Sequence, residues 1–246
     1  MTYNICVDYI YIEHIDETDY PDITFHFTGE VNIVNTATDF KCYGIYDFNT
    51  GSNVFVLPKK GKLYKNDVLI YEGKFTEKGE YTGKCVLYHE NGNKQYEGTM
   101  LKHRYSGFGK EYDENGDMVY EGDWVDGLQY GLGDQYENDI MIYSGYWYHG
   151  SKTGKGQDYS SSSRLYDGEW KDNMWHGAGT HYCEDGMIIE TTWERGQKNG
   201  MGSIEMPNGN FMINCEWKND ILLRPGQEVV PLSKLRKTRN KYTQTA

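Results

Sequence analysis

Aromatic residues and glycines alternate with polar residues in short runs along most of the chain. In the segment YEGDW, Tyr120, Gly122 and Trp124 occupy every second position, and Glu121 and Asp123 stand between them. A period of two is typical of a β-strand with one buried and one solvent-exposed face. The pattern therefore predicts strands in which tyrosine, glycine and tryptophan share one face.

This strand pattern recurs every 23 to 25 residues. Its aromatic third position is Met100 in one copy, and the tyrosine and glycine are replaced in the last two copies. Repetition at a fixed period indicates a repeat architecture with about six full units and a partial seventh. The predicted framework residues are Tyr71, Gly73, Phe75, Tyr96, Gly98, Tyr120, Gly122, Trp124, Tyr143, Gly145, Trp147, Tyr166, Gly168, Trp170, Trp193 and Trp217.

A Gly-x-Gly pair follows each strand and predicts the second strand of a β-hairpin. Asp126-Gly127 lies after a first strand, and Asn-Gly or Asp-Gly pairs at 91–92, 115–116, 185–186 and 208–209 lie after second strands. Such pairs suit tight hairpin turns in which both central residues have positive φ. We therefore expect an antiparallel meander of hairpins.

Glycine normally weakens the interior of a strand because it has no side chain to pack. A glycine between two rings, such as Gly122, leaves bare backbone that a neighbouring ring can cover. We interpret these glycines as surfaces on which rings lie.

The combined pattern of Tyr-x-Gly-x-Trp, Gly-x-Gly and Asn-Gly resembles the MORN repeat over about two thirds of the chain. The resemblance implies an all-β fold, an elongated ribbon or solenoid of antiparallel β-hairpins. Second strands such as Gly109-x-x-Tyr112 look more like variant MORN units. Three residues is an odd spacing, so either a bulge restores the face of Tyr112 or the second face of the sheet is aromatic too.

The repeat pattern predicts three regions. Residues 61–222 form the array, and residues 223–246 form a basic tail without repeats. Residues 1–60 contain alternating runs such as ITFHFTGEVNIV, which fit either decayed repeats that cap the array or a separate β region.

Charge is distributed unevenly between the body and the tail. The total is −12, whereas the residues from Arg224 onward carry +5 and the remainder −17. The acidic body disfavours nucleic acid as a partner, because phosphates would be repelled. Candidate partner-contact residues in the tail are Arg224, Lys234, Arg236, Lys237, Arg239 and Lys241.

The chemistry of catalytic, cofactor or metal sites is not evident in the sequence. GSKTGKG at 150–156 has the wrong spacing for a phosphate loop, and DENGDMVYE at 113–121 has its glycine misplaced for a calcium loop. The five scattered cysteines are interpreted as free thiols in a reducing compartment. We therefore expect no enzyme activity, no cofactor and no metal.

These observations favour a structural scaffold that binds other proteins of a larger assembly or further copies of the chain. The N-terminus lacks a basic n-region and no apolar run could span a bilayer, so we expect an intracellular protein, cytoplasmic or within an assembly, and not a secreted one. Proteins similar to MORN repeats occur in cytoskeletal, axonemal and giant-virus assemblies, and the Tyr, Asn and Ile usage suits a protist or giant-virus genome. The alternative is a membrane-tethering adapter whose basic tail binds anionic lipid.

We predict an extended particle in solution. Two strands advance a ribbon by about 10 Å, so about seven units span on the order of 70 Å. Small-angle X-ray scattering should give a radius of gyration well above that of a sphere of equal mass. A radius typical of a compact sphere would contradict the ribbon.

Overall fold

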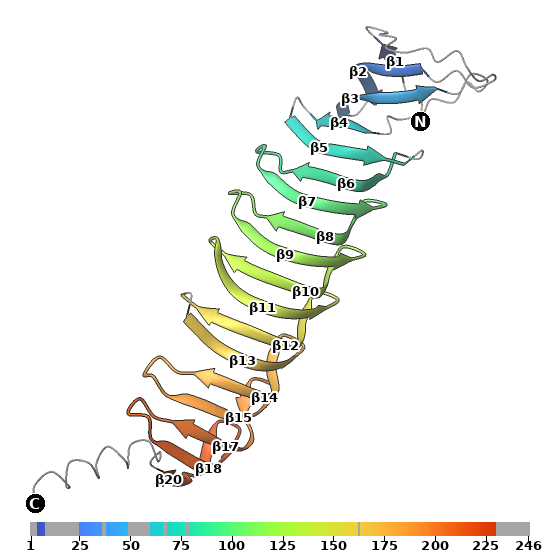
Figure 1. Cartoon of the computed structure of the whole chain (residues 1–246). Coiled ribbons are helices and arrows are strands. Elements are labelled where there is room, and N and C mark those ends of the chain that lie inside the picture. Colours follow the sequence, from blue (N-terminus) through green and yellow to red (C-terminus); the bar gives the residue numbers. More distant parts are fainter. Residues whose placement is uncertain are drawn as a thin grey trace, which may run out of the picture. The chain divides into compact units, whose positions relative to one another are not determined.

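The structure is antiparallel and all-β. The computed structural model describes residues 4–7, 25–35, 38–48, 60–65, 68–76, 79–161 and 163–229 (Figure 1). The chain divides into two compact units: unit 1 is residues 1–129 with 137–139, and unit 2 is residues 130–136 with 140–246. The strands are β1 Asn4–Val7, β2 Phe25–Asn35, β3 Thr38–Phe48, β4 Lys60–Lys65, β5 Val68–Phe75, β6 Tyr81–Tyr88, β7 Lys94–Leu101, β8 Arg104–Tyr112, β9 Met118–Val125, β10 Leu128–Glu137, β11 Ile140–Tyr148, β12 Ser151–Ser160, β13 Ser163–Lys171, β14 Met174–Tyr182, β15 Ile188–Glu194, β16 Gln197–Lys198, β17 Gly200–Glu205, β18 Phe211–Lys218, β19 Ile221–Arg224 and β20 Gln227–Val229.

Successive strands pair with one another inside each unit. In unit 1, β1 to β9 form an unbroken series of antiparallel neighbours. In unit 2, the series runs from β11 to β15, continues through β17 to β18, and ends with β19 and β20 on the outer edge of β18 (Figure 1). The predicted fold class, an all-β array of antiparallel hairpins, is confirmed.

The strands of the N-terminal region continue the backbone register of the array. Gly29 lies opposite Gly44, Gly44 opposite Gly61, and Gly61 opposite Gly73. A row of glycines thus runs across β2 to β5, and whether residues 1–60 are decayed repeats or a separate β region stays a prediction. The three predicted region boundaries themselves stay predictions.

In the repeats of Tyr96, Tyr143 and Tyr166, the core is a tyrosine ring that lies along its own strand over two opposed glycines. Tyr143 is fully buried, and Gly145 on its strand faces Gly156 on the next. The Tyr143 hydroxyl donates to the backbone oxygen of Tyr146 at 3.0 Å. A Cβ on Gly145 would lie 2.5 Å from both the Tyr143 hydroxyl oxygen and the Gly156 Cα. The covering ring thus belongs to the strand of the first glycine, and both glycines are required for its close approach.

In four repeats a tryptophan connects the hairpin to the one before it. The Trp170 indole donates to the Gly156 carbonyl at 3.2 Å, and its ring meets the Tyr143 ring edge-on with centroids 5.0 Å apart. The glycine that lies under one tyrosine therefore accepts a hydrogen bond from the next repeat. Equivalent indole-to-glycine bonds are Trp124 to Gly109, Trp147 to Gly133, and Trp193 to Gly179.

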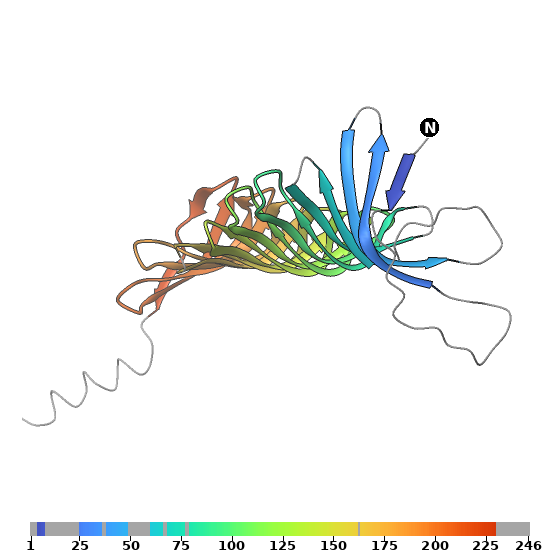
Figure 2. The ribbon, with the colours of Figure 1, turned by 90° about the horizontal axis from the view of Figure 1, so that it is seen from above.

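The first glycine of each Gly-x-Gly pair lies in a bulge that bends the strand. Gly145 pairs with Gly156, whereas Tyr146 pairs with Thr153, so β12 has two extra residues between those positions. One of them, Gly154, has φ +60, which favours glycine. Bulges bend strands and increase their twist, and Figure 2 shows the strands bowed along their length.

The turns are of two kinds, and the sequence predicted one of them wrongly. Asp126 and Gly127 have φ of +51 and +83, as the two-residue turn requires. In the four turns after second strands only the glycine has positive φ, and the loop is longer: the amide of His89 donates to the Asn93 carbonyl across Asn91-Gly92. The extra residues remove the need for positive φ at Asn91, Asn115, Asp185 and Asn208.

The odd spacing after the second glycine places tyrosines on the other face of the sheet. The Tyr159 hydroxyl lies 2.6 Å from Oε1 of Gln157, which is adjacent to Gly156 and on the opposite face. A register shift does occur before Tyr159, but the extra residue, Leu165, is on β13. At this repeat, therefore, the second face carries the tyrosine.

The structure places the first residues of the predicted tail in strands. β19 and β20 both pair with β18, and the Arg224 guanidinium lies 3.5 Å from the Glu216 carboxylate. Residues 230–246, with the other five candidate contact residues, lie outside the described residues.

Packing predicts that Gly145→Val destabilises the array by about 3 kcal/mol, because Cβ overlaps the Tyr143 ring and the facing backbone. Gly116→Val is the matched control. Its Cβ would have no atom closer than 3.7 Å, so only its φ of +95 costs stability, about 1–2 kcal/mol. Urea unfolding followed by tryptophan fluorescence measures both. Equal midpoints for Gly145→Val and wild type would contradict the packing.

Alkaline pH should unfold the array. Burial raises the pKa of Tyr71, Tyr96, Tyr143 and Tyr166 well above the ordinary value. The folded pKa exceeds the unfolded value of about 10, so the stabilisation is complete below that pH and is lost as pH rises above it. Phenolate absorbance should show one group of tyrosines titrating normally and a second ionising only together with the loss of β-sheet circular dichroism. Titration of all tyrosines near pH 10 without unfolding would be inconsistent with this burial.

Candidate interaction surface

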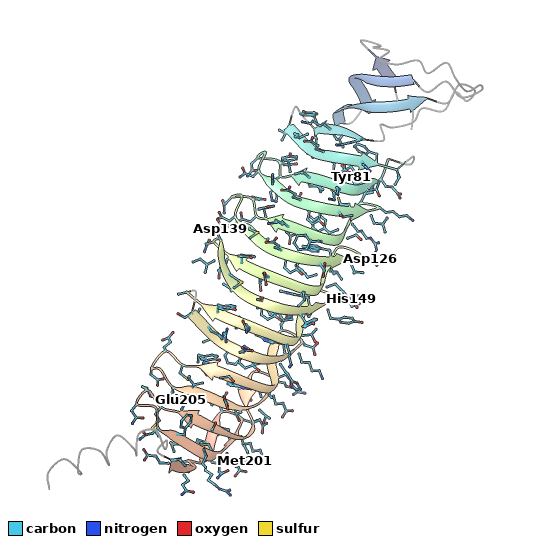
Figure 3. The ribbon with its side chains drawn as sticks, in the orientation of Figure 1. Tyr81, Asp126, Asp139, His149, Met201 and Glu205 are labelled. Carbon is cyan, nitrogen blue, oxygen red and sulfur yellow. The ribbon has the colours of Figure 1, made fainter. Side chains whose placement is uncertain are left out.

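The two faces of the sheet differ in how their side chains are used. The ring face carries the buried tyrosines and tryptophans described above. The open face carries the residues between them, and most of these reach solvent. Figure 3 shows side chains along both units, with Met201 and Glu205 marking the two ends of β17. The ring face is occupied by core packing, so the open face is the one whose side chains are available to solvent.

Carboxylates form a periodic column on the open face, at the position between tyrosine and glycine. Glu97 is 2.7 Å from Lys94, Glu121 is 2.9 Å from Lys110, and two further carboxylates of this column make similar pairs. Such exposed pairs contribute little to stability, about 0–1 kcal/mol each. Their repetition indicates a solvated surface, as the sequence predicted, rather than an acid–base pair. The remaining pairs are Glu72 with Lys62 and Asp167 with Arg164.

The residue between the two glycines of each Gly-x-Gly pair is strongly exposed on the open face. Phe108 is 56% exposed, Leu132 58% and Met201 49%. Each of these three residues has a glycine on both sides at the bulge, so no Cβ of an adjacent residue covers its side chain. We call this position the display position; its other occupants are Lys84, Lys155 and Ala178.

Unit 1 has a shallow groove around two display positions. Its volume is about 560 Å³, and Phe108 and Val86 form its apolar part. Charged side chains of both signs surround them: Lys60, Lys84, Lys110, Glu72 and Glu97. An apolar groove with a charged rim fits a protein segment that carries both charged and apolar side chains.

Unit 2 has an exposed aromatic cluster at the β11–β12 turn. The rings of Tyr130 and Tyr148 are 5.6 Å apart, and His149 lies 4.3 Å from Tyr148. Tyr146 and Tyr148 are 48% and 55% exposed, and Figure 3 shows His149 at the edge of the strands. Equivalent positions in the other repeats hold mostly polar or charged residues, so this repeat presents a surface that its neighbours lack.

A third position, two residues before each Gly-x-Gly pair, covers the buried tyrosine of the ring face. Tyr105 stacks on Tyr96 at 3.7 Å and 3°. Lys152 takes this place above Tyr143, with its ammonium 4.5 Å from the ring centre and 4.0 Å from the Asp158 carboxylate. Burial lowers the pKa of Lys152 and raises that of Asp158. This stacking position therefore accepts a flat ring or a cation.

Comparison with known families agrees with this geometry. The family model of the MORN repeat matches residues 96–118, 120–134, 166–188 and 192–211. The first and third of these segments each span one hairpin and the beginning of the next strand. The chain contains four MORN repeats. Comparison with curated proteins found no match.

The MORN geometry also extends beyond the matched segments. Tyr143, Gly145 and Trp147 lie between the second and third matches, yet they form the same tyrosine-on-glycine arrangement. In unit 1, Tyr71 lies over Gly73, and Cys85 takes the place of the second glycine. The internal repeat in the sequence located these units where the family model does not.

The predicted framework residues of the MORN array lie on the ring face. Their tyrosines and tryptophans are at most 6% exposed, and Phe75 is 8% exposed. These residues pack together on the ring face. Arg224, the candidate contact residue of the tail that the structure describes, instead pairs with Glu216. No cluster of metal-ligating side chains occurs among the described residues, and no helix that could cross a membrane is found in that part of the chain. Cys85, Cys183 and Cys215 carry free thiols.

Sequence reasoning missed the display and stacking positions. Both recur at the repeat period, but their residue types change from copy to copy, as Tyr105, Lys152 and Trp175 illustrate. A search for identical residues overlooks such columns. Comparison of every column of the MORN repeats for exposed apolar side chains would have found Phe108 and Leu132.

Proposed function

We propose that this MORN-repeat protein is a non-enzymatic scaffold whose open face binds other proteins. MORN repeats commonly mediate protein or membrane interactions, and they are not a family of enzymes. The observation that carries the proposal is the display position, where a fixed backbone site presents a different side chain in each repeat. Solvent-exposed apolar side chains in a regular array are typical of recognition surfaces.

The division between the two faces supports this function. Residues that stabilise the fold lie on the ring face, so substitutions on the open face change recognition without loss of the core. The groove around Phe108 combines apolar side chains with charged ones of both signs, which suits a polar protein partner better than a small apolar molecule. Within an assembly, such a protein would hold partners at intervals of one repeat, about 10 Å.

The test is affinity capture from native material with the wild type and with the double variant Phe108→Asp and Leu132→Asp. We expect at least a tenfold loss of specifically captured protein and an unchanged melting temperature, because both side chains are more than half exposed. A double control, Ser160→Asp with Asn115→Asp, adds the same charge at other exposed positions. Equal capture by both double variants would contradict recognition by the display positions.

Lipid binding is the competing outcome of the same experiment. Co-sedimentation with vesicles of anionic lipid should leave the wild type in the supernatant, because unit 2 is acidic over its described residues. Sedimentation that is lost when residues 230–246 are deleted would favour the membrane-tethering adapter instead.

A further inference from the structure

One carboxylate of the open face lacks the partner that its counterparts have. In the column between tyrosine and glycine, Glu72, Glu97, Glu121 and Asp167 each pair with a lysine or arginine. Glu190 occupies the same position on β15, but no ion pair joins it to any residue that the structure describes. Its neighbours across the strands are hydroxyl residues, Thr180 on β14 and Ser203 on β17.

Glu190 lies in a shallow groove that is open to solvent. The groove has a volume of about 410 Å³, and it is lined on the open face by Ala178, Thr180, Thr192, Met201 and Ser203 around the glutamate. These side chains are small or flexible, in contrast to the lysines and tyrosines of the other repeats. The groove therefore has room for an aliphatic stem with a cationic head, which is the shape of a lysine side chain.

We propose that this groove binds the basic C-terminal segment of the same chain, with the Lys234 ammonium against the Glu190 carboxylate. Residues 230–246 contain five basic residues and no acidic ones, whereas the described residues of unit 2 have a net charge of −5. The preceding basic residue, Arg224, already pairs with Glu216 on the adjoining strand β18. The segment would extend this contact toward β15.

The strand register shows that Lys234 can reach Glu190. Val229 pairs with Phe211, Phe211 with Glu205, and Glu205 with Ile188, two residues before Glu190. Three strand spacings and two residues amount to a separation of about 16 Å. The five residues from Val229 to Lys234 span about 16 Å when extended, and the lysine side chain adds further reach.

The next acidic residue of the column matches the next basic residues of the segment. Glu190 pairs with Thr180, and Thr180 pairs with Asp167 on β13. Asp167 is thus two strands away, about 10 Å, which equals about three extended residues. Lys237 is three residues beyond Lys234, so one extended path across the strands accommodates both pairs.

Zero-length carbodiimide cross-linking of the full chain tests this proposal, and it requires no partner protein. We expect peptide mass spectrometry to identify an amide between Glu190 and Lys234 within one chain. Glu190→Gln should reduce all cross-links of Lys234 to β15 at least tenfold. The matched control Glu194→Gln, which changes another exposed carboxylate on the same face and strand, should leave the Glu190–Lys234 yield within twofold.

Two further results would overturn the proposal. In a mixture of light and ¹⁵N-labelled protein, a Glu190–Lys234 cross-link that joins light and heavy peptides would assign the groove to a second copy. Equal cross-linking of Lys234 to many carboxylates, in the wild type and in Glu190→Gln alike, would show that the groove has no preference for Lys234.

The same cross-link separates this proposal from the proposed function. Loss of partner capture by the display-position variants with no change in the Glu190–Lys234 cross-link would show that the two are independent.

Discussion

A tyrosine ring lying on two bare glycines is the interaction on which the other features depend. When no other element packs on a sheet, a large side chain that projects straight out from the sheet is exposed to water. Here Tyr143 lies flat along its own strand, and the absence of Cβ atoms on Gly145 and Gly156 lets it approach the backbone. Trp170 of the next repeat then packs edge-on against the Tyr143 ring, and its indole donates a hydrogen bond to the Gly156 carbonyl. Aromatic residues replace the aliphatic core of an ordinary domain, which accounts for the low mean hydropathy of the chain.

This arrangement separates stability from the recognition proposed above. The tyrosine, glycine and tryptophan positions of the ring face are constrained by the fit between rings and backbone, although the stacking position varies between Tyr105, Lys152 and Trp175. The display position on the open face has no such packing constraint, so Phe108, Lys155 and Ala178 can share one backbone position. In the proposed scaffold, a shared backbone position with varied side chains would let each repeat supply its own contact to a partner.

The sequence predicted the features that depend on local pattern. The period, the strands, the shared face of Tyr120, Gly122 and Trp124, and the Asp126-Gly127 turn all follow from residue type and spacing. It did not predict how tyrosines after the second glycine would be placed, because Tyr159 depends on which strand of a pair holds the extra residue. The Asn91-Gly92 turn was misjudged since loop length, rather than the dipeptide, decides which residues need positive φ. The Glu190 groove forms because β14, β15 and β17 carry small or flexible side chains around Glu190 on the open face. The pattern of a single repeat does not show this.

The bond from each tryptophan to the glycine of the preceding hairpin has a consequence for how such proteins change in length. Trp170 reaches Gly156 fourteen residues back, and Trp193 reaches Gly179 at the same interval. Where a junction between hairpins is made by these equivalent atoms, a gene that gains or loses one whole repeat rejoins a tryptophan to a glycine that already fits it. Recombination between repeats can thus lengthen or shorten the protein without inventing a new contact, whereas the loss of one or two residues within a hairpin would misalign the bulge, the ring and the indole together. We therefore expect proteins of this fold to differ in length by whole hairpins.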